Sequence, residues 1–298
     1  MSADETAQVR AMLAGFSGDL SLEQLRAAYD GMGAAFGIPD DVTVTPQMVG
    51  NLPAEWTWVA DAAADRVILY LHGGGFTTGS LVSHRHGVAE LGRLAKCRTL
   101  ALDYRLAPEH PFPAAVDDCL EGYRFLLGKG IAPANIAIAG DSAGAGLVVS
   151  LLAAARDAGL PQPACGVCFS PWVDLEAMGG TIDSKAGADP LVSRDALLMM
   201  AGAYRAGADP RDPRISPLYA ELAGLAPLLI QVGTAEALLD DSVRLATRAG
   251  VQNVDVRLEL WPDMVHVWHF FFPILSEGRR ALGVAADYIR GKLENASA

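Results

Sequence analysis

A serine that could act as a nucleophile lies in a turn rich in small residues. The stretch Ile136 to Arg156 begins as an apolar strand, passes through Gly140-Asp141-Ser142-Ala143-Gly144 and continues as a helix. This pentapeptide fits the G-x-S-x-G pattern, in which a sharp strand-to-helix turn lifts a serine hydroxyl out of a sheet. The flanking glycines let the two backbones approach closely. The pattern therefore predicts that Ser142 attacks an electrophilic carbon and forms a covalent intermediate.

The pentapeptide alone is weak evidence, because glycine, alanine and serine are common residues. One alternative is that Ser142 caps the N-terminus of an ordinary helix. A second is a membrane span, because about twenty residues here are nearly all apolar. Asp141 in the middle of the stretch, with several glycines and serines, favours a buried strand followed by a buried helix. A nucleophilic serine also needs an oxyanion-binding loop, a base and an acid.

A histidine and an acidic residue follow the serine in the required order. His266 comes after the last predicted strand, and catalytic residues of open α/β sheets gather at the carboxyl ends of strands. Its rival, His269, is expected inside the next helix. An acid must orient the imidazole, and the stretch VGTAEALLDDS offers Glu236, Asp240 and Asp241. Glu236 directly follows a strand and is preferred, with Asp240 as the second candidate.

Three glycines follow a buried strand upstream of the serine. Residues 66–72, RVILYLH, form a continuous apolar run that leads into Gly73-Gly74-Gly75-Phe76. Backbone N–H groups with no side chains in the way can bind the negative charge that develops on a carbonyl oxygen. An ordinary flexible turn is the alternative. His72 is expected to order this loop by hydrogen bonding and not to titrate in catalysis.

Strands alternate with helices along most of the chain, which indicates a mostly parallel sheet wrapped on both sides. Two further β-like runs lie between residues 42 and 60. Trp56 and Trp58 share one face of the second run, which is expected to be a half-buried edge strand. Residues 254–260 alternate between apolar and polar side chains, so this strand is also expected near a sheet edge.

Two segments differ from this alternating core. Residues 1–40 contain two predicted helices, and Ser21 to Gln24 gives the second a capping box. Residues 170–217 are rich in Gly, Asp and Pro and carry one amphipathic helix at 193–204, which makes them too long for a simple connection. We expect these two segments to form a cap over a core of residues 41–169 and 218–298.

The motifs together resemble the bacterial hormone-sensitive-lipase-like esterases, which have the α/β-hydrolase fold. The matching blocks are His72–Gly75, Asp103–Ala115 (DYRLAPEHPFPAA), Gly140–Gly144 and Val265-His266. The resemblance runs from about residue 40 to the end of the chain. It implies an α/β-hydrolase fold with a helical cap, Ser142 as nucleophile and His266 as base. It also implies an oxyanion hole made by backbone N–H groups of Gly73, Gly74, Gly75 and Ala143.

The acid block departs from the family pattern. The family usually has D-P-L-R-D, whereas this chain has Glu236-Ala237-Leu238-Leu239-Asp240. A glutamate therefore replaces the first aspartate, and Asp240 matches the second. The α/β-hydrolase order of serine, acid and histidine accepts either Asp or Glu, so Glu236 stays the preferred acid and Asp240 the alternative.

The resemblance implies a serine carboxylesterase that hydrolyses short- to medium-chain esters through an acyl-enzyme, with no metal or cofactor. One alternative is a lactone or amide hydrolase with the same triad. Another is a non-catalytic small-ligand receptor, like the plant gibberellin receptors that are similar to this family but lack a working triad. Side chains in the cap-like segments are candidates for the substrate pocket: Leu13, Phe16, Trp172, Leu191 and Met200.

Composition limits the partners and the compartment. The 298 residues are 51% hydrophobic, which argues against disorder, and their net charge of −12 opposes binding to nucleic acid or anionic lipid. The acidic N-terminus lacks the apolar region of a signal peptide. Four cysteines form no disulfide pattern, and the Cys165/Cys168 pair lies in an expected buried strand. We expect a cytoplasmic protein that acts on a small ester without nucleic acid or membrane, and a homodimer is compatible with the sequence.

Overall fold

An eight-stranded sheet forms the centre of the molecule. The structure is a computed structural model that describes residues 3–14 and 20–295. The strands lie in the order β1-β2-β4-β3-β5-β6-β7-β8. From β4 to β8 neighbouring strands are parallel, whereas β1–β2 and β2–β4 pair antiparallel. The strand bounds are β1 (Thr43–Val49), β2 (Leu52–Trp58), β3 (Ala63–Leu71), β4 (Cys97–Leu102), β5 (Ile136–Asp141), β6 (Cys165–Phe169), β7 (Leu228–Gly233) and β8 (Val256–Trp261).

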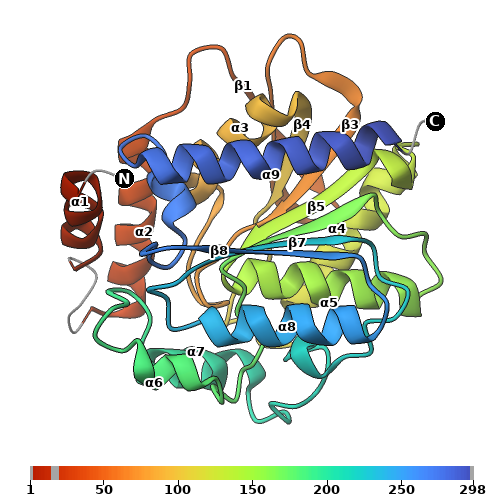
Figure 1. Ribbon diagram of the computed structural model, residues 1–298. Helices are drawn as coiled ribbons and strands as arrows, with labels where there is room; N and C mark the ends of the chain where they lie inside the picture. Colours follow the sequence, from red (N-terminus) through yellow and green to blue (C-terminus); the bar gives the residue numbers. More distant parts are fainter. Residues whose placement is uncertain (1–2, 15–19, 296–298) are drawn as a thin grey trace.

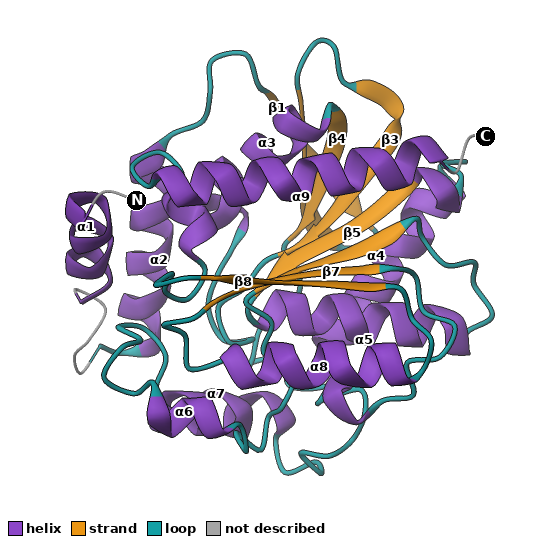
Figure 2. Cartoon of the chain, in the orientation of Figure 1, coloured by secondary structure: helices purple, strands orange, loops and turns teal. Residues whose placement is uncertain are grey.

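Helices cover both faces of this sheet, as the alternating sequence predicts (Figures 1 and 2). One face carries α3 and α9, and the other carries α4, α5 and α8. Their bounds are α3 (Leu81–Ala95), α4 (Ala114–Gly128), α5 (Ala143–Asp157), α8 (Leu239–Val251) and α9 (Ser276–Asn295). Short 3₁₀ helices lie at Pro133–Asn135 (η1), Pro217–Tyr219 (η2) and Trp268–Phe271 (η3). The prediction of an α/β-hydrolase architecture is confirmed.

The central strands are almost entirely apolar where they cross the core, which fits the burial of both of their faces. In β3, Val67, Leu69 and Leu71 pack into the core on the side of α4 and α5. Ile68 and Tyr70 pack into the other core, beneath α3 and α9. Strands buried on both faces read as continuous hydrophobic runs, which explains why the sequence pattern identified them.

The remaining helices gather at one end of the sheet (Figure 1). They are α1 (Ala3–Ala14), α2 (Leu22–Phe36), α6 (Gly180–Ser184) and α7 (Arg194–Arg205). The predicted capping box begins α2: Ser21 Oγ accepts a hydrogen bond from Gln24 N at 3.2 Å, and Ser21 N donates to Gln24 Oε1 at 2.9 Å. The short helix α6 is not predicted by the sequence.

One edge of the sheet differs from the prediction. Strand β2, which carries Trp56 and Trp58, is flanked by β1 and β4, so β1 is the edge strand. The half-buried pattern of β2 describes its faces and does not say which strands pair with it. At the opposite edge lies β8, as its alternating pattern predicts.

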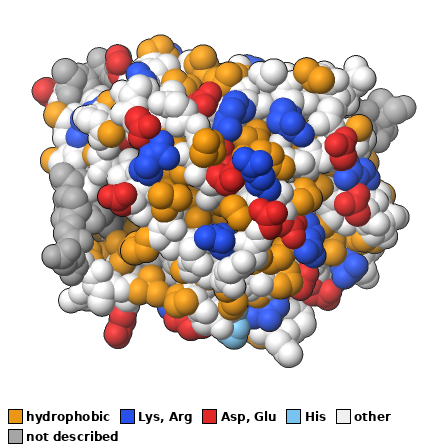
Figure 3. Space-filling view, turned by 90° about the horizontal axis from the view of Figure 1, so that it is seen from below, with side chains coloured by type: hydrophobic (Ala, Val, Ile, Leu, Met, Phe, Trp, Pro, Cys, Tyr) orange, Lys and Arg blue, Asp and Glu red, His pale blue; other side chains and the backbone are white. Residues whose placement is uncertain are grey.

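Charged side chains of both signs are mixed on the surface. On the face seen from below α7 and α8, basic and acidic residues are interspersed and hydrophobic residues form small groups (Figure 3). The four cysteines, including Cys165 and Cys168 in β6, are free and buried. Within the described residues, no helix is both long and apolar enough to cross a membrane.

Candidate active site

Ser142 lies in a strained turn between β5 and α5. Its backbone has φ 52° and ψ −119°, and its side chain makes no capping hydrogen bond to the helix. A positive φ is costly for a non-glycine residue, and such strain is typical of functional turns. A Cβ on Gly144 would overlap the carbonyl oxygen of Leu71, so the helix can approach the sheet this closely only with glycine there. Ser142 therefore does not cap α5 with its side chain, and this 15-residue helix is not long enough to cross a membrane.

Ser142, His266 and Glu236 form one hydrogen-bonded chain. Ser142 Oγ lies 2.9 Å from His266 Nε2, and His266 Nδ1 lies 2.9 Å from Glu236 Oε2. His266 is in the loop after β8, and Glu236 is in the loop after β7. The three residues follow the carboxyl ends of β5, β7 and β8, which are parallel strands of one sheet, and this explains how positions far apart in the sequence meet.

The environment of the pair favours a charged imidazole. Burial alone would lower the pKa of His266, because it disfavours the cation. The hydrogen bond and negative charge of Glu236, with smaller contributions from Asp189 and Asp141, outweigh burial and raise the pKa of His266 above its usual 6.5. Burial also raises the pKa of Glu236, against the hydrogen bonds that favour its anion. In this pair the carboxylate is the anion and the pKa of the imidazole is raised, because every hydrogen-bond partner of the carboxylate favours its charged form.

Glu236 is held by two further groups. Its Oε1 accepts hydrogen bonds from Gly233 N at 2.6 Å and from Ser170 Oγ at 2.8 Å. Ser170 Oγ in turn accepts from Val267 N at 3.2 Å, next to the histidine. Ser170 directly follows β6, and this position after a strand could have identified it as a candidate site residue. Nothing in the neighbouring sequence indicates that it bonds Glu236.

The other candidate acids and bases lie elsewhere. Asp240 accepts a hydrogen bond from Gly180 N at 3.0 Å, and its side chain is 33% exposed. Asp241 is buried and accepts from the backbone N–H groups of residues 173 and 174. His269 bonds Gln231 at 3.0 Å, and burial lowers its pKa to about 3. His72 contacts its own loop through Gly73 O at 2.7 Å, as expected for an ordering residue.

The glycine loop presents N–H groups beside Ser142. Gly74 and Gly75 have positive φ values of 111° and 62°. In the described part of the chain, the backbone N–H groups of Gly74, Gly75 and Ala143 have no hydrogen-bond acceptor. The N–H of Gly73, by contrast, donates to Asp141 Oδ1 at 3.0 Å. Of the four predicted oxyanion donors, the N–H of Gly73 therefore already has an acceptor, whereas those of Gly74, Gly75 and Ala143 do not.

Asp141 ties the serine turn to the glycine loop. Besides Gly73 N, its Oδ1 accepts a hydrogen bond from Tyr70 OH at 3.0 Å, and Oδ2 lies 3.4 Å from His84 Nε2. Burial alone would raise the pKa of Asp141, but His84, Tyr70 and His72 together lower it. The carboxylate is therefore a fixed anion beneath the loop. The sequence motif contains Asp141, yet it does not reveal these partners.

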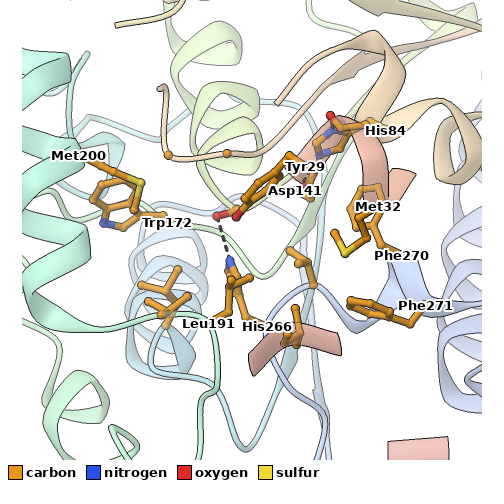
Figure 4. Close-up of a pocket in the computed structure, with 18 of the residues that line it drawn as sticks. Tyr29, Met32, His84, Asp141, Trp172, Leu191, Met200, His266, Phe270 and Phe271 are labelled. Carbon is orange, nitrogen blue, oxygen red and sulfur yellow. Dashed lines mark hydrogen bonds and ion pairs between the residues drawn. The ribbon is translucent and has the colours of Figure 1, made fainter. Parts of the chain in front are cut away.

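The serine opens into a largely apolar pocket between the two predicted cap segments. Its volume is about 840 Å³, open solvent included. The predicted residues Leu13, Trp172, Leu191 and Met200 all line it, whereas Phe16 lies outside the described residues. Figure 4 shows Trp172, Leu191 and Met200 on one side of the Ser142–His266 hydrogen bond, with Met32, Phe270 and Phe271 on the other. Tyr29, Val192 and Leu197 also line the pocket and were not predicted.

The described side chains offer no cluster of three or more His, Cys, Asp or Glu residues arranged to hold a metal ion. Ser142, His266, Gly74 and Gly75 meet at one largely apolar pocket, and the buried carboxylate of Glu236 bonds the imidazole from outside the pocket lining. This combination can perform nucleophilic acyl transfer.

Comparison with known proteins shows that the chain is similar to hydrolases. A family model described as the alpha/beta hydrolase fold matches residues 68–270. An acetyl-hydrolase of Streptomyces hygroscopicus is 48% identical over 273 residues, which cover 90% of each chain.

Solved structures are similar over nearly the whole chain. The crystal structure of an esterase from the bacterial hormone-sensitive lipase family has a TM-score of 0.96 and 44% identity, covering 98% of this chain and 99% of that one. An esterase crystal soaked with p-nitrophenyl butyrate has a TM-score of 0.94 and 41% identity, covering 98% and 100%.

Proposed function

Because the chain belongs to the bacterial hormone-sensitive-lipase-like esterases of the α/β-hydrolase fold, it is a carboxylic ester hydrolase, and we propose that Ser142, His266 and Glu236 carry its reaction. The supporting observation is the hydrogen-bonded chain from Glu236 through His266 to Ser142 Oγ. Serine, base and acid in this arrangement activate the hydroxyl for attack on a carbonyl.

The proposed reaction has two halves. Ser142 Oγ attacks the ester carbonyl while His266 Nε2 takes its proton. The tetrahedral oxyanion accepts hydrogen bonds from the N–H groups of Gly74, Gly75 and Ala143, and its collapse releases the alcohol, which takes the proton from His266. A water molecule then attacks the acyl-enzyme and gives a proton to His266. Release of the carboxylic acid returns that proton to Ser142.

Glu236 acts on the imidazole and not on the substrate. Its carboxylate holds His266 with Nδ1–H toward Oε2, so Nε2 is free to accept the serine proton. The same negative charge stabilises the imidazolium that forms during both halves of the reaction.

We also propose that residues 1–40 and 170–217 form a cap that selects esters with short to medium acyl chains, over a core of residues 41–169 and 218–298. The support is the pocket lining: Leu13 and Met32 come from the first segment, and Trp172, Leu191 and Met200 from the second. An apolar pocket of limited volume favours small hydrophobic groups.

Replacing the serine tests the assignment. Ser142→Ala should lower kcat for p-nitrophenyl butyrate by a factor on the order of 10⁴ or more, because loss of a nucleophile removes the covalent route. The variant should keep the melting temperature of the parent within a few degrees, measured by circular dichroism. Residual activity above about a tenth of the parent's would refute the nucleophile. Amides with the same acyl group, and lactones, are assayed in parallel to measure the alternative hydrolase activities.

Other parts of the proposal concern the surroundings of the enzyme. We propose a cytoplasmic enzyme, supported by four free, buried cysteines, and small esters as its partners in place of nucleic acid or membranes. A homodimer stays a prediction, and light scattering of the purified protein measures its oligomeric state.

A further inference from the structure

Helix α7 rests directly on the glycine loop. Met200 and Tyr204 are four residues apart and lie on the same side of this helix. A Cβ added to Gly75 would overlap Met200 Sδ, so the thioether covers that glycine. The ring of Tyr204 stacks on Phe76, with centroids 3.9 Å apart and planes 9° from parallel. A helix of the proposed cap thus contacts two successive residues of the loop.

The contacted part of the loop has an unusual backbone. Gly74, Gly75 and Phe76 have φ values of 111°, 62° and 62°. For the two glycines this conformation is cheap, but Phe76 carries a Cβ and is disfavoured there. A residue held in such a conformation needs surroundings that fix it. Phe76 is 2% exposed, and its carbonyl accepts a hydrogen bond from Ala107 N at 2.9 Å.

Tyr204 is itself firmly placed. It is 1% exposed, its carbonyl accepts a hydrogen bond from Phe112 N at 2.8 Å, and the Phe112 ring meets it edge-on at 6.1 Å. Its hydroxyl is buried without a hydrogen-bond partner among the described residues. The contact with Phe76 is therefore made by the face of the ring, and the hydroxyl group contributes nothing to it.

From this contact we infer that Tyr204 is a positioning residue for the oxyanion hole. Its ring holds Phe76 in the left-handed conformation, and Phe76 fixes the direction of the N–H groups of Gly74 and Gly75. Met200 covers the same loop one helical turn earlier. The cap helix therefore sets the rate of the reaction as well as the shape of the pocket. This inference rests on the proposed oxyanion role of the loop.

The test compares the rate with the binding of an oxyanion mimic. Tyr204→Leu removes the stacked ring and should lower kcat for p-nitrophenyl butyrate at least about tenfold, with KM changed less than about threefold. A trifluoromethyl ketone adds to the serine and forms a tetrahedral oxyanion, so its inhibition constant should rise by a similar factor. Tyr204→Phe keeps the ring and should leave both quantities within about twofold of the parent.

Two further variants separate positioning from general loss of stability. Tyr123→Leu removes a buried tyrosine of α4 that is outside the pocket. It should lower the melting temperature and leave the inhibition constant of the folded enzyme unchanged. Should Tyr204→Leu fail to fold, Tyr204→Met keeps most of the volume without the ring and should show the same loss of inhibitor binding.

Unchanged inhibition by the ketone in a folded Tyr204→Leu or Tyr204→Met enzyme overturns the inference. The proposed function fails in a different way, through an active Ser142→Ala enzyme or a parent enzyme that the ketone does not inhibit. The two failures are therefore distinguishable.

Discussion

Glu236 uses its two carboxylate oxygens for different tasks. Oε2 bonds His266, while Oε1 accepts hydrogen bonds from Gly233 N and Ser170 Oγ. The carboxylate is fully buried, so removing it would leave the imidazolium without its hydrogen-bonded counter-charge in a site of low dielectric. Glu236 is thus the residue at which a single change should affect the imidazole most directly.

We predict that Glu236→Gln lowers kcat at least about a hundredfold, because an amide can no longer stabilise the imidazolium and can favour the wrong tautomer. Asp240→Asn is the matched control, since Asp240 bonds Gly180 N and lies outside the triad. It should keep kcat within about threefold. Steady-state kinetics with p-nitrophenyl butyrate measures both, and the reverse ranking would transfer the role of the acid to Asp240.

The pH profile should reflect the raised pKa of His266. The imidazole acts as a base only when it is neutral, so activity is lost as pH falls through its pKa. Because this pKa lies above 6.5, the acid limb of kcat/KM should have its midpoint above that value. In Glu236→Gln the negative charge is gone, and the midpoint should move to lower pH. A profile that is flat down to about pH 4, well below an ordinary histidine pKa, contradicts the role of His266.

For single residues, the sequence identifies which side chains are candidates for the site better than it identifies what they contact. That Ser142, His266 and Glu236 lie together was predictable, because each follows a strand and their order along the chain is that of the α/β-hydrolases. The use of Gly73 N by Asp141 was not predictable, because it depends on the distance between two loops that are 68 residues apart. The role of Ser170 was not predictable for the same reason, because its partners lie in the loop after β7 and in the loop that carries His266.

Among the elements, the loop after β3 and the turn after β5 act together. These parallel strands pair directly, with Leu71 opposite Gly140, so their carboxyl ends lie side by side. Asp141 then bridges the two through Gly73 N, Tyr70 OH and the nearby His84. The turn that carries Ser142 and the glycine loop, the proposed nucleophile and oxyanion donors, are therefore held by one buried carboxylate.

We predict that Asp141→Ala lowers kcat at least about tenfold and also lowers stability. It leaves Tyr70 OH buried without an acceptor, at about 1–3 kcal/mol for such a group, and leaves Gly73 N only the 3.3 Å hydrogen bond to His84 Nε2. Asp141→Asn keeps one acceptor oxygen and should be milder in both respects. Urea unfolding and steady-state kinetics measure the two effects. An Asp141→Ala enzyme with the parent's kcat would show that the bridge does not position the loop.

The elements themselves followed from the sequence where burial is continuous. Strands buried on both faces and helices between them produce strong patterns, so β3 to β7 were predictable. That β1, and not β2, is the edge strand was not predictable, because the residue pattern of β2 indicates which of its faces is buried and not which strands pair with it. Helix α6 has only five residues and sits in a segment rich in Gly and Asp, where helix propensity is weak.

The whole molecule joins distant segments around one pocket. Residues from α1 and α2, from the segment 170–217 and from η3 line the same space above Ser142. The sequence suggested that these segments form a cap, yet it could not say which side chains oppose one another. Leu191 and Met32 lie on opposite sides of the Ser142–His266 hydrogen bond (Figure 4). We predict that an ester bound at Ser142 extends its acyl group to one side of this hydrogen bond and its alcohol group to the other.

This division predicts that Leu191→Trp and Met32→Trp change different halves of the substrate profile. Each adds bulk to one side of a packed apolar pocket and should reduce kcat/KM about tenfold or more for the longer groups that occupy that side. Two series measure the effect: p-nitrophenyl esters from acetate to decanoate vary the acyl group, and acetates of alcohols of increasing size vary the other half. One variant should change only the acyl series and the other only the alcohol series. If both substitutions shorten the same series, Leu191 and Met32 do not line separate arms, and the serine is reached through a single channel.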